Sequence, residues 1–139
     1  MVHERLKRLE DHIRSLEAFR HRYDRETILA DEHVQWGLRY GLFEAIQMVI
    51  DIACHLVNVR HLGTPSTYGE CVDLLEKYGY LDADLARRLH SMIGLRNILI
   101  HEYVRVDITR LIDYLEHLDD FRKFLRAVYP HLKNMPSDK

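Results

Sequence analysis

The chain has 139 residues, the size of one ordinary domain, of which 47% are hydrophobic and 30% are charged. This composition is typical of a soluble globular protein and excludes a disordered chain. The net charge of −2 excludes the bulk attraction to nucleic acid that a basic domain supplies, so any RNA binding requires a local basic site. We find no apolar run of membrane-spanning length and no signal-peptide core, and we therefore expect a cytoplasmic protein that binds no membrane.

The first predicted helix covers residues from about Val2 to Tyr23. Its apolar residues recur every three or four positions and form one stripe on a charged helix. They are Val2, Leu6, Leu9, Ile13, Leu16 and Phe19. Asp24 follows this segment and can cap the helix that comes next.

The second predicted helix, from about Thr27 or Asp31 to Val59, is apolar on two sides. One stripe contains Val34, Leu38, Leu42, Ala45, Val49, Ile52 and Leu56, and the other contains Trp36, Tyr40, Phe43, Ile50, Cys54 and Val57. A helix of this kind must bury both stripes, and a few short helices offer limited cover. The second stripe is therefore either a subunit interface or the buried side of the central helix in a monomeric bundle.

A polar stripe lies between the two apolar ones and contains Glu44, Asp51, His55 and Asn58. At about 100° per residue these four side chains fall within roughly 60° of one another. Asp51 and His55 are four residues apart, close enough for a hydrogen bond. The stripe is either a solvated face or the floor of a cleft, so Asp51 and His55 are candidate cleft-lining residues.

A loop rich in glycine and proline, residues 61–66, separates this helix from a short one. Ser66 or Thr67 can cap the short helix. We expect that helix to run to about Lys77 and to end at Gly79.

Two further helices complete the prediction. One runs from Asp82 to Ile100 or Glu102, the last begins at Asp107, and a loose polar tail covers about residues 130–139. No strand-like alternation, repeat or linker is present. We therefore expect all 139 residues to form one all-α domain, an antiparallel four-helix bundle with a short additional helix.

Metal and disulfide sites are not expected. Cys54 and Cys71 lack metal or redox spacing and lie in apolar helical patterns, where cysteine usually acts as a small hydrophobic residue, so we expect no structural disulfide. The Asp-Ala-Asp triplet at residues 82–84 resembles the metal-binding pair of nucleotidyltransferases, but no Gly-Ser phosphate loop precedes it, and it opens a helix, where Asp is ordinarily a cap. The histidines show no ligand spacing, and we expect no metal and no cofactor.

Candidate catalytic residues lie near the end of the next-to-last predicted helix, where Arg96, His101 and Tyr103 fall within eight positions. Arg96 and Tyr103 are seven residues apart and share a helix face. Asn97 and His101 share another face, turned by roughly 100° to 140° from that of Arg96. The group converges only if the helix ends near His101 or if a partner chain supplies half of the site, as at a symmetric dimer cleft.

This group suits RNA cleavage without a metal. Two His101 side chains, one from each subunit, could act as base and acid because histidine titrates near neutral pH. Arg96 could bind the phosphate and stabilise the charge of the transition state, and Asn97 could orient His101. Alternatively, His101 is a helix cap or an ordinary surface residue.

The stretch from about Gln35 to Asp120 resembles the HepT branch of the HEPN superfamily. The residues that carry the resemblance are Ile50 to His55, Pro65 to Tyr68, Met92 to Asn97, His101 to Tyr103, and Asp107. The resemblance implies a HEPN-like helical bundle that dimerises, with Arg96 and His101 of both subunits lining a shared cleft. It also implies a ribonuclease toxin.

The resemblance further implies a partner, a minimal nucleotidyltransferase antitoxin, with which a larger hetero-oligomer can form. In part of the family this partner adds AMP to the motif tyrosine, here Tyr103, and the added charge and bulk would repel and block RNA. Alternatively, Tyr103 only hydrogen-bonds or stacks on a base. Many relatives carry an acidic residue next, whereas Val104 and Arg105 follow here. Arg105 is either a cleft-lining phosphate contact or an exposed charge.

The sequence thus predicts the toxin of a type VII-like toxin–antitoxin system, an endoribonuclease that the antitoxin neutralises by AMPylating Tyr103. The alternative is a non-catalytic helical dimer that binds a nucleotidyltransferase partner or a nucleotide. A plain assembly scaffold is a third interpretation, and it predicts that alanine at Arg96 and His101 is tolerated.

Overall fold

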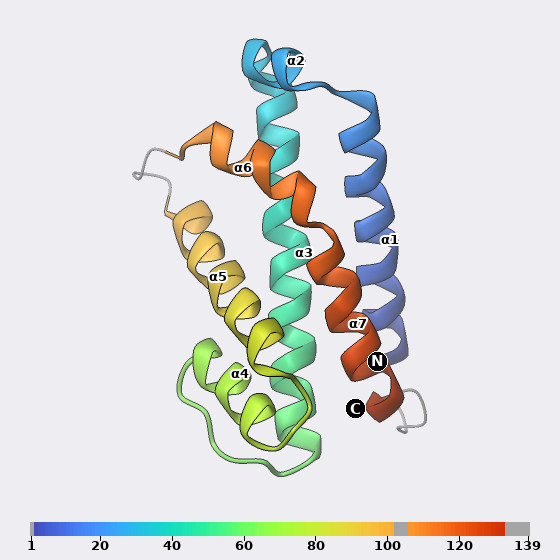
Figure 1. Ribbon diagram of the computed structural model, residues 1–139, viewed down its shortest axis with the longest axis vertical. Helices are drawn as coiled ribbons and strands as arrows, with labels where there is room; N and C mark the ends of the chain where they lie inside the picture. The colour runs from blue at the N-terminus through green and yellow to red at the C-terminus, as the bar shows by residue number, and fades with distance from the viewer. Residues whose placement is uncertain (1, 102–105, 133–139) are drawn as a thin grey trace.

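The computed structural model describes residues 2–101 and 106–132, and every regular element in these ranges is helical. The helices are α1 (Val2–Arg22), α2 (Arg25–Ala30), α3 (Glu32–Val59), α4 (Tyr68–Lys77), α5 (Ala83–Ile100), α6 (Ile108–Tyr114), the short 3-10 helix η1 (Leu115–His117) and α7 (Asp119–Leu132). The long helices α1, α3, α5 and α7 run alternately up and down, so that the chain forms an antiparallel bundle with α3 in the middle (Figure 1). The predicted all-α bundle is confirmed.

Most helices begin where the sequence predicts, because a side chain accepts a hydrogen bond from a free backbone N–H at the first turn. These capping residues are Asp24, Asp31, Thr67, Asp82 and Asp107. The helix α4 is followed by Gly79 with φ +83°, a left-handed conformation that glycine adopts without strain. Local sequence signals therefore set most helix bounds.

The last helix differs from its prediction in two ways. The 3-10 turn η1 divides it into α6 and α7, and periodicity cannot detect this break because Leu111, Leu115 and Leu118 stay buried across it. The predicted loose tail from about residue 130 is also wrong for its first residues. Pro130 lies inside α7, which ends at the fully buried Leu132.

The core is built around α3, which packs against α1, α4 and α5. Leu38 through Leu56 of its first apolar stripe are buried, whereas the second stripe divides along the helix. Ile50 and Val57 are buried, but Trp36 is 52% exposed and Tyr40 is 64% exposed. The second stripe is therefore core in its C-terminal half and open surface in its N-terminal half.

By length and composition α3 could cross a membrane, with a mean hydropathy of 1.5 over 18 residues. Half of that window is buried inside the bundle, as in the core helix of a soluble protein. The surrounding helices therefore account for the apolar character of the buried half.

Candidate functional site

The helix α5 ends at Ile100, and His101 is its C-cap residue with extended backbone angles. The prediction that the helix ends near His101 is therefore confirmed. The imidazole is exposed, directly beyond the last turn of α5. The candidate residues Tyr103 and Arg105 lie outside the described residues.

The guanidinium of Arg96 is held by side chains from three helices. Its Nε donates a 3.0 Å hydrogen bond to Oε1 of Gln47 on α3, and its Nη1 donates a 3.0 Å bond to Oδ1 of the neighbouring Asn97. The guanidinium carbon lies 5.1 Å from the ring centre of Tyr68 at the start of α4 and 6.0 Å from that of Phe43 on α3. Both distances are within the range of cation–π attraction.

The polar stripe of α3 extends this network away from Arg96. The amide nitrogen of Gln47 donates a 3.0 Å bond to Oδ1 of Asp51, so one amide connects the carboxylate to the guanidinium. Asp51 is exposed, and His55 is half-buried one turn further along the same helix. The structure thus brings together Arg96, Asn97 and Asp51.

Sequence reasoning missed three of the residues that hold Arg96: Gln47, Phe43 and Tyr68. Gln47 carried a usable signal, because it lies three residues after Glu44 and four before Asp51 and so continues the polar stripe. Nothing in the sequence indicates that Phe43 and Tyr68 contact Arg96, since these contacts depend on which helix faces meet.

One hollow of about 230 Å³ lies beside this network, between α1 and α3. It is lined by Arg5, Arg8, Phe43, Glu44, Gln47, Met48 and Asp51. Glu44 accepts a 2.7 Å hydrogen bond from Nε2 of His12 and a 2.8 Å bond from the hydroxyl of Tyr40, and these bonds lower the pKa of Glu44 below its usual value. Two carboxylates and two guanidiniums, those of Arg5 and Arg8, therefore line this hollow.

A second hollow, of about 590 Å³, lies on the other side of Arg96, between α4 and α5. It is lined by Cys54, Pro65, Ser66, Thr67, Tyr68, Gly69, Cys71, Ile93 and Asn97. No carboxylate belongs to this lining. Charged side chains of both signs thus line the first hollow and none line the second, although both hollows adjoin the contacts of Arg96.

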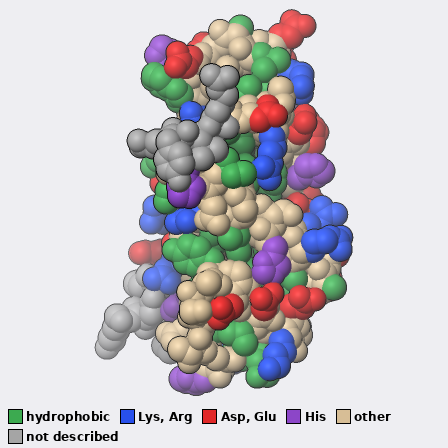
Figure 2. Space-filling model, turned by 90° about the vertical axis from the view of Figure 1, so that its left-hand side faces the viewer, with side chains coloured by type: hydrophobic (Ala, Val, Ile, Leu, Met, Phe, Trp, Pro, Cys, Tyr) green, Lys and Arg blue, Asp and Glu red, His purple; other side chains and the backbone are tan. Residues whose placement is uncertain are grey.

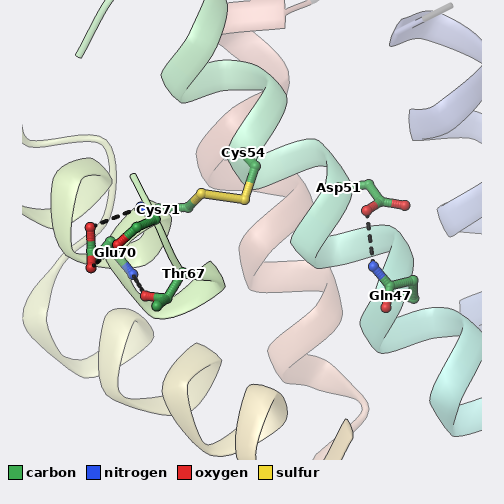
Figure 3. The surroundings of a disulfide bond; sticks show 7 residues. Gln47, Asp51, Cys54, Thr67, Glu70 and Cys71 are labelled. Carbon is green, nitrogen blue, oxygen red and sulfur yellow. Dashed lines mark hydrogen bonds between the residues drawn. A yellow bond between two sulfur atoms is a disulfide. The ribbon is translucent and has the colours of Figure 1, made fainter. Parts of the chain in front are cut away.

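The expectation that Cys54 and Cys71 are independent small hydrophobic residues is wrong, because a disulfide joins them. Figure 3 shows this bond bridging α3 and α4, with Gln47 and Asp51 earlier on α3. The packing of α3 on α4 brings the two Cα atoms to 5.2 Å, within the range that a disulfide requires. The sequence places each cysteine on an apolar face but does not show that the two faces meet.

The two aspartates of the Asp-Ala-Asp triplet have structural roles. Asp82 caps α5 by accepting a bond from the backbone N–H of Leu85, and Asp84 forms ion pairs with Arg87 and Arg88. Among the described residues no group of three or more metal-ligating side chains lies together. Figure 2 shows basic, acidic and hydrophobic side chains mixed on the α4–α5 side, without one broad basic patch.

The helical arrangement and the Arg96 site can be compared with known proteins. A sequence model described as "Ribonuclease HepT-like" matches residues 9–128, which is most of the chain. The chain belongs to the HepT-like ribonuclease family. The resemblance found in the sequence is thereby confirmed, together with the ribonuclease class of activity that it implied.

Individual relatives agree with this assignment. The chain is 31% identical over 99 residues to the mRNA nuclease HepT of Shewanella oneidensis, covering 70% of this chain and 74% of that protein. It is 33% identical over 93 residues to a putative RNase of Archaeoglobus fulgidus, covering 66% of this chain and 70% of the relative.

Solved structures share the fold of this chain. The tri-AMPylated HEPN toxin of Shewanella oneidensis in complex with the MNT antitoxin matches with a TM-score of 0.84 and 24% identity, over 93% of this chain and 96% of that one. The cytosolic protein YutE of Bacillus subtilis, of unknown function, matches with a TM-score of 0.69 and 18% identity, over 94% of both chains. These likenesses show that the chain has the same fold as these two proteins, one of which is a HEPN toxin.

Proposed function

We propose that this HepT-like protein is the toxin of a toxin–antitoxin pair and cleaves RNA without a metal, using Arg96, Asn97 and His101 of two subunits. The observation that carries the proposal is the fixed guanidinium of Arg96 on the last turns of α5, close in sequence to the exposed His101 at the helix end. Such a pair supplies a cation for phosphate and an imidazole that can take or give a proton.

The reaction follows from these groups. One His101 takes the proton of the ribose 2′-hydroxyl, whose oxygen attacks the phosphorus. The 5′-oxygen leaves and takes a proton from the second His101, so the products carry a 2′,3′-cyclic phosphate and a 5′-hydroxyl. Arg96 uses Nε and Nη1 to bind Gln47 and Asn97, and its Nη2, which has no partner among the described residues, is left for the phosphate.

A homodimer is proposed because this reaction needs two His101 side chains. The exposed aromatic residues Trp36 and Tyr40 line a hollow of about 350 Å³ together with Ile100, the residue before His101. Ile100 is itself 46% exposed. A symmetric contact through this patch would bury exposed apolar area and bring the two α5 ends together.

The proposed partner is a minimal nucleotidyltransferase antitoxin in the cytoplasm, which silences the toxin by adding AMP to Tyr103. Support comes from the similar Shewanella oneidensis toxin, which is described as tri-AMPylated and bound to the MNT antitoxin. AMP groups near His101 would place phosphate charge where the RNA phosphate binds and so repel RNA. Arg105, His55 and Asp51 are proposed to line the same cleft.

The test is RNA cleavage in EDTA by purified protein whose Tyr103 is shown by mass spectrometry to be unmodified. We expect 2′,3′-cyclic phosphate ends from the unaltered protein, and a loss of at least about a hundredfold in rate for Arg96→Ala and His101→Ala. Arg126→Ala, which removes an exposed arginine from α7, is the matched control and should keep full activity. Inactive unmodified protein that still binds a nucleotidyltransferase would support the non-catalytic dimer instead.

A further inference from the structure

We propose that the hollow between α4 and α5 is a nucleobase subsite, in which one unpaired base of single-stranded RNA stacks on Tyr68 while its phosphate binds Arg96. This inference rests on the proposed function, because it names a part of the RNA that the same site would hold. The hollow measures about 590 Å³, within the range of known small-molecule pockets.

The position of Tyr68 is the first argument. Tyr68 is 39% exposed and lines the hollow, and the guanidinium of Arg96 lies 5.1 Å from the centre of its ring. A phosphate bound by Arg96 would therefore have its own nucleoside within reach of this ring. Aromatic rings and arginine planes are the surfaces on which proteins stack unpaired RNA bases.

The rest of the lining suits a base better than a phosphate. The disulfide between Cys54 and Cys71, together with Ile93, provides an uncharged wall, and polarisable sulfur packs well on aromatic rings. Asn97 adds an amide whose oxygen is occupied by Arg96, while its nitrogen has no partner among the described residues. That amide nitrogen can donate a hydrogen bond to a carbonyl or ring nitrogen of a base.

The opposite hollow, between α1 and α3, fits an uncharged base poorly. Arg5 and Arg8 line it together with Glu44 and Asp51, so its lining carries charges of both signs. A base inserted there would take charged side chains out of water, which costs free energy. The uncharged lining of the α4–α5 hollow therefore suits a stacked base better.

The hydroxyls at the mouth of the hollow have structural roles of their own. Ser66 donates from Oγ to Glu70, and Oγ1 of Thr67 accepts from the backbone N–H of Glu70, so both hold the first turn of α4 in place (Figure 3). This capping fixes the backbone at Tyr68, the next residue. The stacking surface is thus held in position before RNA arrives.

The test measures binding of a single-stranded RNA with 2′-O-methyl riboses, which cannot be cleaved because the attacking hydroxyl is blocked. We expect Tyr68→Ala to weaken binding by about fivefold or more, the range measured for loss of one stacked base. Tyr68→Phe keeps the stacking ring and should bind within about twofold of the unaltered protein. Tyr129→Ala removes a tyrosine of similar exposure, 52%, that lines a different hollow, and should have no effect.

A second set of RNAs, each lacking one base, identifies the contact. One abasic position should weaken binding to the unaltered protein and cause no further loss in Tyr68→Ala, because both changes remove the same interaction. Three results would overturn the subsite. Tyr68→Ala and the unaltered protein could bind the RNA equally well, one abasic position could cost both the same affinity, or neither could bind the RNA. Binding that depends on Tyr68 without any cleavage would refute the nuclease and leave the subsite standing.

Discussion

The two faces of α3 differ in burial although they belong to one helix. The face that turns inward, including Leu38, Leu42 and Ile46, is completely buried. The face that turns outward carries Trp36 and Tyr40 at its beginning, both more than half exposed, and a polar network further along. The comparison teaches that this chain alone buries the inner face, whereas it leaves the aromatic start of the outer face exposed, where we propose that a second subunit binds.

The largest expected effect comes from the inner face. Leu42→Ala removes a fully buried side chain and leaves a cavity, so it should lower the free energy of unfolding by about 2–5 kcal/mol. Urea unfolding followed by circular dichroism measures this change. A loss below about 1 kcal/mol would show that the inner face is not the well-packed core described above.

The matched change on the outer face is Trp36→Ala. It should leave the free energy of unfolding of the monomer within about 0.5 kcal/mol, because the indole is half exposed. Its effect should instead appear in self-association, where a central tryptophan typically contributes about 2 kcal/mol or more. Sedimentation over a range of protein concentrations measures self-association, and urea unfolding measures monomer stability. Unchanged self-association would show that Trp36 does not belong to the interface.

The next effect concerns the bond that ties α4 to the outer part of α3. Reducing the Cys54–Cys71 disulfide, which closes a loop of 17 residues, should lower the free energy of unfolding by up to about 3 kcal/mol. Urea unfolding with and without a phosphine reductant measures the loss. A double variant with serine at both positions is the control and should not respond to the reductant, whereas an unaltered protein that also fails to respond would contradict the structural role.

The smallest expected effect tests the polar network of the outer face. Gln47→Ala removes the amide that holds Nε of Arg96, and should lower the rate of RNA cleavage about tenfold, which corresponds to one hydrogen bond to a charged group. Because Gln47 acts through Arg96, Gln47→Glu should recover part of the rate: it keeps an acceptor for Arg96 but replaces the N–H that donates to Asp51 with a second carboxylate. Equal losses in both variants would indicate that Gln47 only supports packing.

Much of the fold could be predicted from the sequence because its signals are local. Aspartate and threonine caps and the spacing of apolar residues mark the starts of α2 to α6 within one or two residues. The 3-10 turn that begins at Leu115 was not predicted, because the apolar repeat continues through it. Periodicity reports which side of a helix is apolar and not whether the helix is continuous.

The candidate site was only partly predictable. Arg96 and His101 could be found because they form a short motif at a helix end. Their surroundings could not, since the contacts of Arg96 with Gln47 and Tyr68 join helices that are far apart in the chain. The disulfide was missed for the same reason, because it depends on which faces of α3 and α4 meet.

The way in which Arg96 is held has a consequence for the affinity of the site. A free arginine side chain loses roughly 2 kcal/mol of rotamer entropy when a ligand fixes it. Here two hydrogen bonds and two aromatic rings already restrict the guanidinium in the folded protein without a ligand. Most of the rotamer entropy of Arg96 is therefore lost on folding and not on binding. If Arg96 binds an RNA phosphate as proposed, little ordering remains to be done when the RNA binds, which favours binding even by a weakly charged protein.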